Sequence, residues 1–93
     1  MRIYDVSVRL SETTPIYPGD PGIEIKSWKS LADGDSANVS LLYIGVHCGT
    51  HVDAPAHFIA GAGRVESLPL EALIGEAQVV AVPEDITTID ASF

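Results

Sequence analysis

Alternating apolar and polar positions mark several stretches of this 93-residue sequence as strands. In residues 3–10, "IYDVSVRL", every even position is apolar, as expected for a strand with one buried face. Residues 23–30, "IEIKSWKS", alternate again, and residues 39–46, "VSLLYIGV", form an apolar run that is typical of a buried strand. A further strand-like run lies in residues 76–85. The pattern therefore predicts a chain dominated by strands.

Residues that favour turns and caps separate these strands. The segment "SETTPIYPGDPG", residues 11–22, contains three prolines and two glycines and is predicted to be a loop with a turn at Pro18-Gly19. Further along, Ser67 and Gly75 bracket a stretch that suggests one or two helical turns. We therefore expect residues 1–93 to belong to a single domain of mixed α/β type, with more strand than helix.

Aromatic side chains within these predicted elements are expected to supply part of the core. Trp28 and Phe58 are assigned to the hydrophobic interior, because large aromatic side chains dominate the packing of small domains. The hydrophobic fraction of 46% is that of a globular domain.

Charge and cysteine content narrow the functional classes. The formal charge of −8, from 13 acidic and 5 basic residues, argues against nucleic acid and anionic membrane surfaces as partners. The single cysteine, Cys48, excludes an internal disulfide. Residues 1–10 lack the apolar core of a signal peptide, and no apolar stretch approaches the roughly 20 residues of a membrane span. A cytoplasmic protein is the resulting expectation.

All three histidines lie in the twelve-residue window "HCGTHVDAPAHF", residues 47–58. His47, His51 and Asp53 are all odd-numbered, so in a strand their side chains would point to the same face. However, four residues of a straight strand span about 13 Å, too far for bonds of about 2.0–2.1 Å to one zinc ion. A bend at Gly49-Thr50 would let the three side chains converge, because glycine adopts positive φ. They would then form a triad that leaves one position open for water, as in catalytic zinc sites.

Other interpretations of this window have comparable support from spacing alone. The histidines could be surface or hydrogen-bonded residues, and Asp53 could belong to a turn. Cys48 has the opposite parity and is expected to be a small buried side chain rather than a ligand. His57 could serve as a proton-transfer group beside the metal instead of binding it.

The proline-rich loop also allows two interpretations. It could be a rigid turn, or it could present Tyr17 over a pocket where the ring stacks on a substrate. Tyr43 could line the same pocket, since it has the parity of the histidines. The glycine-rich stretch "GAGR", residues 61–64, lacks the spacing of a phosphate-binding loop.

Two ordered motifs make the sequence resemble a known family. "HCGTHVDAPAHF" resembles the H-x-G-T-H-x-D-x-P-x-H-F signature of the metal-dependent cyclase-like hydrolases, which include bacterial kynurenine formamidase and isatin hydrolase. "TPIYPGDP" resembles the N-terminal loop of that family, and "PLEALIGEAQVV" resembles the segment after its histidine motif. The resemblance thus extends over nearly the whole chain.

The resemblance implies roles for individual residues. His47, His51 and Asp53 would be metal ligands, His57 would donate and accept the proton, and Tyr17 would contact the substrate. The metal would be Zn²⁺, with Mn²⁺ in some members. The fold implied is a swivelling β/β/α domain, usually in dimers or larger homo-oligomers.

The function implied is metal-dependent hydrolysis of an amide-type bond in a small molecule, such as an N-formyl aryl amine, a lactam or a lactone. Family members are longer, and their second half adds a histidine and a glutamate to the metals, whereas this chain has no histidine after His57. We therefore expect residues 1–93 to be the N-terminal part of such a domain, with an incomplete fold and doubtful activity alone. A non-catalytic metal-binding subunit, or a structural domain derived from such an enzyme, is the alternative.

Overall fold

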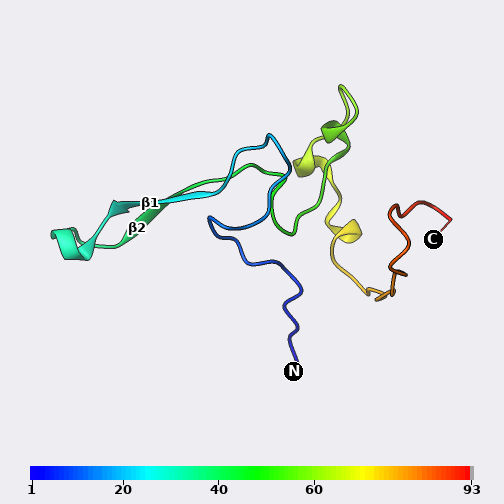
Figure 1. Ribbon diagram of the computed structural model, residues 1–93, viewed down its shortest axis with the longest axis horizontal. Coiled ribbons are helices and arrows are strands. Elements are labelled where there is room, and N and C mark those ends of the chain that lie inside the picture. The colour runs from blue at the N-terminus through cyan, green and yellow to red at the C-terminus, as the bar shows by residue number, and fades with distance from the viewer. Residues whose placement is uncertain (93) are drawn as a thin grey trace.

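One antiparallel strand pair supplies the regular structure of the chain, which a computed structural model describes over residues 1–92 (Figure 1). Strand β1 spans Glu24–Lys29 and strand β2 spans Val39–Tyr43. Glu24 lies opposite Tyr43, and the register shifts once, between Ser27 and Lys29. Both strands fall inside stretches that the sequence pattern predicted, so their positions are confirmed, but β2 is largely exposed instead of buried.

Two further predicted strands are absent from the described residues. Residues 3–10 and residues 76–85 form no strand. The one or two helical turns expected between Ser67 and Gly75 are present as a single 3-10 turn. The described residues contain four such turns and no α-helix: η1 (Leu31–Asp33), η2 (Pro55–His57), η3 (Val65–Ser67) and η4 (Leu70–Ala72). Within residues 1–92, no helix has the length and apolar character needed to cross a bilayer.

The strand pairing brings together two segments that are far apart in the sequence. Because β1 and β2 run antiparallel, the residues that precede β1 lie beside those that follow β2 (Figure 1). The backbone at Gly45 passes so close to Pro21 that a Cβ at Gly45 would lie 3.2 Å from Pro21 Cγ. The proline-rich loop is thereby held next to the start of the histidine window.

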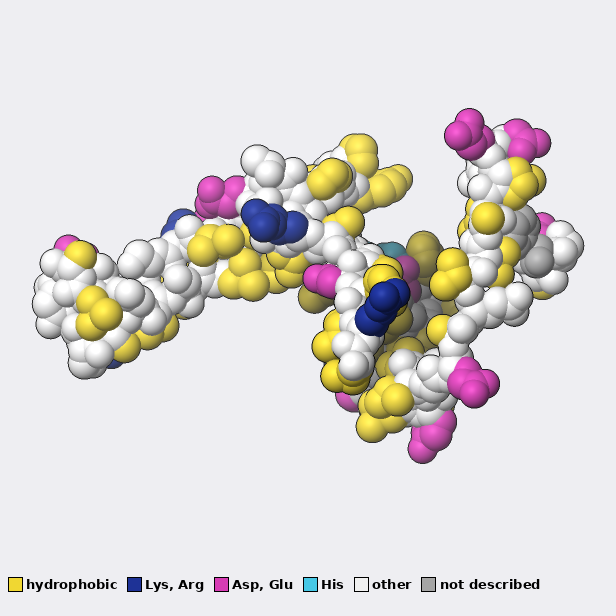
Figure 2. Space-filling view, turned by 90° about the horizontal axis from the view of Figure 1, so that it is seen from below, with side chains coloured by type: hydrophobic (Ala, Val, Ile, Leu, Met, Phe, Trp, Pro, Cys, Tyr) yellow, Lys and Arg dark blue, Asp and Glu magenta, His cyan; other side chains and the backbone are white. Residues whose placement is uncertain are grey.

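Few side chains of this molecule are buried. The radius of gyration is 18.2 Å, against about 12 Å for a compact chain of this length. Ile23 and Cys48 are the buried apolar side chains among the described residues. Trp28 and Phe58, which were expected in the core, are 65% and 83% exposed. Among residues 1–92 no second layer covers the strand pair, which projects from the rest of the chain with apolar side chains along it (Figure 2).

Candidate metal centre

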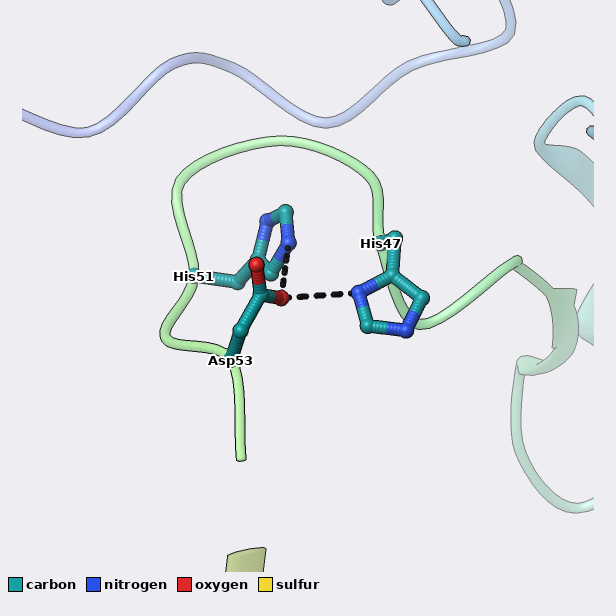
Figure 3. Close-up of side chains that lie close together, drawn as sticks. All are labelled: His47, His51 and Asp53. Atoms are coloured by element: carbon teal, nitrogen blue, oxygen red, sulfur yellow. Dashed lines mark hydrogen bonds and ion pairs between the residues drawn. The ribbon is translucent and has the colours of Figure 1, made fainter. Parts of the chain in front are cut away.

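The chain reverses direction at Gly49, a few residues after β2 ends. Gly49 has φ of +70°, in the left-handed region that glycine adopts without strain. A Cβ at this position would lie 2.5 Å from Leu10 Cδ2, so a larger residue would also collide with the N-terminal segment. The bend predicted at Gly49-Thr50 is confirmed, and it turns the side chains of His47 and His51 toward one another (Figure 3).

The N-terminal segment supports this bend from outside. The backbone N–H of Val8 donates a hydrogen bond of 2.9 Å to Thr50 Oγ1. The side chain of Leu10 occupies the space above Gly49 that a Cβ would need. Within residues 3–10, the backbone N–H of Val8 therefore bonds to the histidine window and not to a neighbouring strand.

His47, His51 and Asp53 converge on one point inside the bend (Figure 3). Asp53 Oδ1 lies 2.8 Å from His47 Nδ1 and 3.1 Å from His51 Nε2. One potential ligand atom from each residue lies within 4.8 Å of the other two. For comparison, two donors of a tetrahedral zinc ion are separated by roughly 3.4 Å, given zinc–ligand bonds of about 2.0–2.2 Å. Asp53 Oδ1 lies closer than this to both nitrogens, so a small outward shift of the carboxylate would make room for one ion.

Hydrogen bonding fixes which nitrogen of His51 is free. His51 Nδ1 lies 2.8 Å from the carbonyl oxygen of Gly49, which can only accept, so Nδ1 carries the proton and donates it. In the neutral ring, Nε2 then has a lone pair that faces a carboxylate oxygen of Asp53 at 3.1 Å. Two electron-rich atoms this close require a proton or a metal cation between them. The donor set therefore fits a divalent metal ion, with the Gly49 carbonyl orienting one ligand.

Asp53 is poised to act as an anionic ligand. The hydrogen bond that it accepts from His47 lowers the pKa of the Asp53 carboxyl, and the weaker effect of desolvation acts in the opposite direction. The carboxylate therefore stays ionised at pH values where an ordinary aspartate begins to take up a proton. A charged carboxylate is the form that binds a metal cation.

His57 lies beside the triad without joining it. Turn η2 begins at Pro55, and the His57 N–H donates to the carbonyl of Ala54 at 2.9 Å. This places the His57 ring in a stack on His47, with ring centroids 3.5 Å apart and planes inclined by 23°. The cluster of potential ligands comprises His47, His51 and Asp53, and His57 lies beside this cluster.

A cavity of about 470 Å³ opens in front of these side chains. Tyr17 lines it, at the start of a turn in which the Asp20 N–H donates to the Tyr17 carbonyl at 3.0 Å and Gly19 has φ of +93°. The proline-rich loop is thus both a tight turn and a wall of the cavity. The full lining is Tyr17, Asp20, His47, His51, Asp53, His57 and Phe58.

Two other expectations have different outcomes. Tyr43 does not line this cavity, because its ring lies on the strand pair with Lys26 Nζ 5.2 Å from its centroid. Cys48 is 8% exposed, as expected for a small buried side chain.

Two polar residues of the site escaped the sequence interpretation. Asp20 lines the cavity, and its position directly after Pro18-Gly19 was the available signal. Thr50 anchors the N-terminal segment, but no sequence pattern shows that its partner is Val8, which lies 42 positions away.

Comparisons with known proteins show which proteins this chain is similar to. A family model described as "Putative cyclase" matches residues 4–92. A kynurenine formamidase of Geobacillus thermodenitrificans (strain NG80-2) is 40% identical over 76 residues, which cover 82% of this chain and 36% of that protein. A kynurenine formamidase of Bordetella petrii (strain ATCC BAA-461 / DSM 12804 / CCUG 43448) is 36% identical over 80 residues, which cover 85% of this chain and 38% of that protein. The chain thus spans little more than a third of the length of these relatives.

Proposed function

The chain belongs to the Cyclase family, and from this premise we propose that it takes part in metal-dependent hydrolysis of an amide-type bond. His47, His51 and Asp53 are assigned as the metal ligands. The observation that carries this assignment is the convergence of the three side chains, in which His51 Nε2 lies 3.1 Å from Asp53 Oδ1, a pair of atoms that a metal cation between them would stabilise.

The ligand set suits zinc, with manganese as the alternative. Two imidazoles and one carboxylate are donors typical of catalytic zinc sites. When bound, the ion would polarise a substrate carbonyl and make a water molecule more acidic. The hydrogen bond from His51 Nδ1 to Gly49 would keep the Nε2 lone pair directed at the ion.

His57 is assigned as the group that moves the proton. It lines the same cavity as the ligands and stacks on His47. It would take a proton from the attacking water and deliver it to the leaving nitrogen as the carbon–nitrogen bond breaks. Tyr17 lines the cavity from the proline-rich loop, where its ring could pack against the substrate.

The substrate class is a small amide, lactam or lactone, and a formamide of an aryl amine is favoured. The relatives in both comparisons are kynurenine formamidases by name. We also propose a homo-oligomer, which would cover apolar side chains exposed on the strand pair. Its mass in solution can be measured by sedimentation.

The test separates metal binding from proton transfer. The chain is purified, zinc affinity is measured by calorimetry, and hydrolysis of an N-formyl aryl amine is followed by absorbance. His47→Ala is expected to abolish zinc binding. His57→Ala is expected to keep zinc and to lower turnover by roughly 10²–10⁴-fold. Loss of zinc from His57→Ala would make His57 a ligand, and absence of zinc binding in the unaltered chain would contradict the proposal.

A second function, metal binding without catalysis, is favoured by one observation. The chain matches little more than a third of each relative, so residues that complete the site in those enzymes can lie outside the matched region. Stoichiometric zinc without hydrolysis of any amide, lactam or lactone tested would support this alternative.

A further inference from the structure

The end of the proline-rich loop makes one close contact with the residues that follow β2. A Cβ at Gly45 would lie 3.2 Å from Pro21 Cγ and 3.5 Å from the Pro21 carbonyl oxygen. Carbon atoms prefer separations of about 3.5–4.0 Å, so any larger residue at position 45 would push against the Pro21 ring. Gly45 does not have positive φ, and glycine is therefore required here by space instead of by backbone conformation.

The chain on the two sides of Pro21 differs in how firmly it is held. On the C-terminal side, Ile23 is 5% exposed and leads directly into the paired strand β1. On the N-terminal side, the turn from Tyr17 to Asp20 is exposed and is closed by its own hydrogen bond, from the Asp20 N–H to the Tyr17 carbonyl at 3.0 Å. A push on Pro21 is therefore transmitted to this turn more easily than to the strand.

This turn supplies one wall of the cavity at the metal centre. Tyr17 and Asp20 line that cavity, and Asp20 is bonded directly to Pro21. The three potential metal ligands lie on a different segment, whose bend is held by Gly49 and by the hydrogen bond from Val8. A displacement of Pro21 is therefore expected to move the wall of the cavity without moving the ligands.

We propose that Gly45 is a positioning residue for substrate binding. Because position 45 has no side chain, Pro21 can lie against the chain that follows β2, and this contact fixes Tyr17 and Asp20 at the wall of the metal cavity. The inference rests on the proposed function in one respect, namely that the substrate occupies this cavity. It predicts that a substitution at Gly45 changes the binding of an aryl ligand and leaves the binding of metal unchanged.

The test uses benzamide, an uncharged aryl amide, as the probe of the cavity. Metal-free protein is titrated with benzamide and the amide signal of Asp20 is followed by NMR, while zinc affinity is measured separately by calorimetry. Gly45→Ala is expected to weaken benzamide binding roughly threefold, because a gap of about 0.5 Å forfeits roughly a quarter of the dispersion attraction across a contact. Its zinc affinity is expected to equal that of the unaltered chain.

Two further comparisons locate the cause of the effect. In a Pro21→Ala background, Gly45→Ala is expected to have no further effect on benzamide binding, because the Cγ atom that the new Cβ meets is gone. Gly22→Ala is the matched control, because it adds a Cβ one residue after Pro21, at a position without positive φ and with no contacting atom within 4 Å. It is expected to bind benzamide as tightly as the unaltered chain.

Each contrary outcome overturns the inference. Unchanged benzamide affinity in Gly45→Ala, an equal loss in Gly22→Ala, or a loss that persists in the Pro21→Ala background would exclude positioning through Pro21. Absence of benzamide binding in the unaltered chain would exclude the turn as the wall of an aryl site. Weaker zinc binding in Gly45→Ala would show that Gly45 acts on His47, two positions away. Failure of the proposed function is distinguishable, because a chain that hydrolyses nothing can still show the Pro21-dependent effect.

Discussion

The β1–β2 ribbon and the metal loop, residues 47–58, achieve order in opposite ways. The ribbon has a continuous backbone ladder, but all six side chains of β1 are exposed. The metal loop has no strand and a single 3-10 turn, yet its ring and carboxylate side chains contact one another and its bend is held from the N-terminal segment. Regular secondary structure and a defined arrangement of side chains are therefore found in different parts of this chain.

This contrast shows which forces position the chemistry. A two-stranded ribbon without a covering layer is marginally stable in water. In the metal loop, one left-handed glycine and a few hydrogen bonds between side chains and backbone direct three potential ligands to one point. Substitutions in the loop should change metal affinity, whereas substitutions in the ribbon should change only stability.

The largest effect is expected from the shared carboxylate. Asp53→Asn removes the negative charge from the ligand atom that lies closest to both histidines, so zinc affinity should fall more than roughly 100-fold. Asp20→Asn is the matched control, because it removes a carboxylate that lines the same cavity outside the triad. Calorimetric titration with zinc measures both. Equal losses would show that overall charge, rather than coordination by Asp53, controls binding.

The next effect compares two glycines with positive φ. Gly49→Ala introduces left-handed strain of about 1–2 kcal/mol and a Cβ that collides with Leu10, so zinc affinity should fall roughly tenfold. Gly34→Ala, in the connection between the strands, introduces similar strain at φ of +91° with open space around the new Cβ. It should lower stability to denaturant and leave zinc affinity unchanged. A fall in zinc affinity with Gly34→Ala would mean that ribbon and loop are coupled.

A smaller effect is expected from the contact between the loop and the N-terminal segment. Thr50→Val keeps the shape of the side chain but removes the oxygen that accepts the Val8 N–H, and zinc affinity should fall roughly threefold. Thr50→Ser keeps an acceptor and should restore most of the affinity. If the valine variant bound zinc as tightly as the unaltered chain, the N-terminal segment would not contribute to positioning the ligands.

The smallest effect is expected on the pH dependence of stability, through the pKa of Asp53. The pKa of Asp53 lies below its ordinary range because Asp53 accepts a hydrogen bond from His47. The stability that this bond adds is present above the unfolded-state pKa and is lost as pH falls through the lower folded-state pKa. An NMR titration of the metal-free protein should show a depressed midpoint for the Asp53 carboxyl. In His47→Ala the midpoint should rise toward the ordinary value, and an unchanged midpoint would exclude His47 as the cause.

The bend and the two paired strands could be predicted because their causes are local. Gly49 lies midway between His47 and His51, and a glycine there predicts a bend that brings the two histidines together. The strands at residues 24–29 and 39–43 pair with each other across a short connection. The swivelling β/β/α domain and its extent over residues 1–93 stay predictions, since a single strand pair does not define that fold.

The incorrect predictions depended on partners that a pattern does not reveal. Alternation in residues 3–10 describes the faces that a strand would have, but a strand also needs a free edge, and this segment lies against Gly49 and Thr50 instead. Trp28 was assigned to the core by its size, yet burial requires a second surface, and the ribbon has none among the described residues.

The spacing of the potential ligands has a consequence for the order of folding events. His47 and Asp53 are six positions apart, so closing the ring around an ion costs little chain entropy, whereas the bond from Val8 to Thr50 must close 42 positions. Local contacts of this kind form faster than distant ones. We expect zinc to be captured first and the N-terminal segment to dock onto a loop that the metal has already shaped.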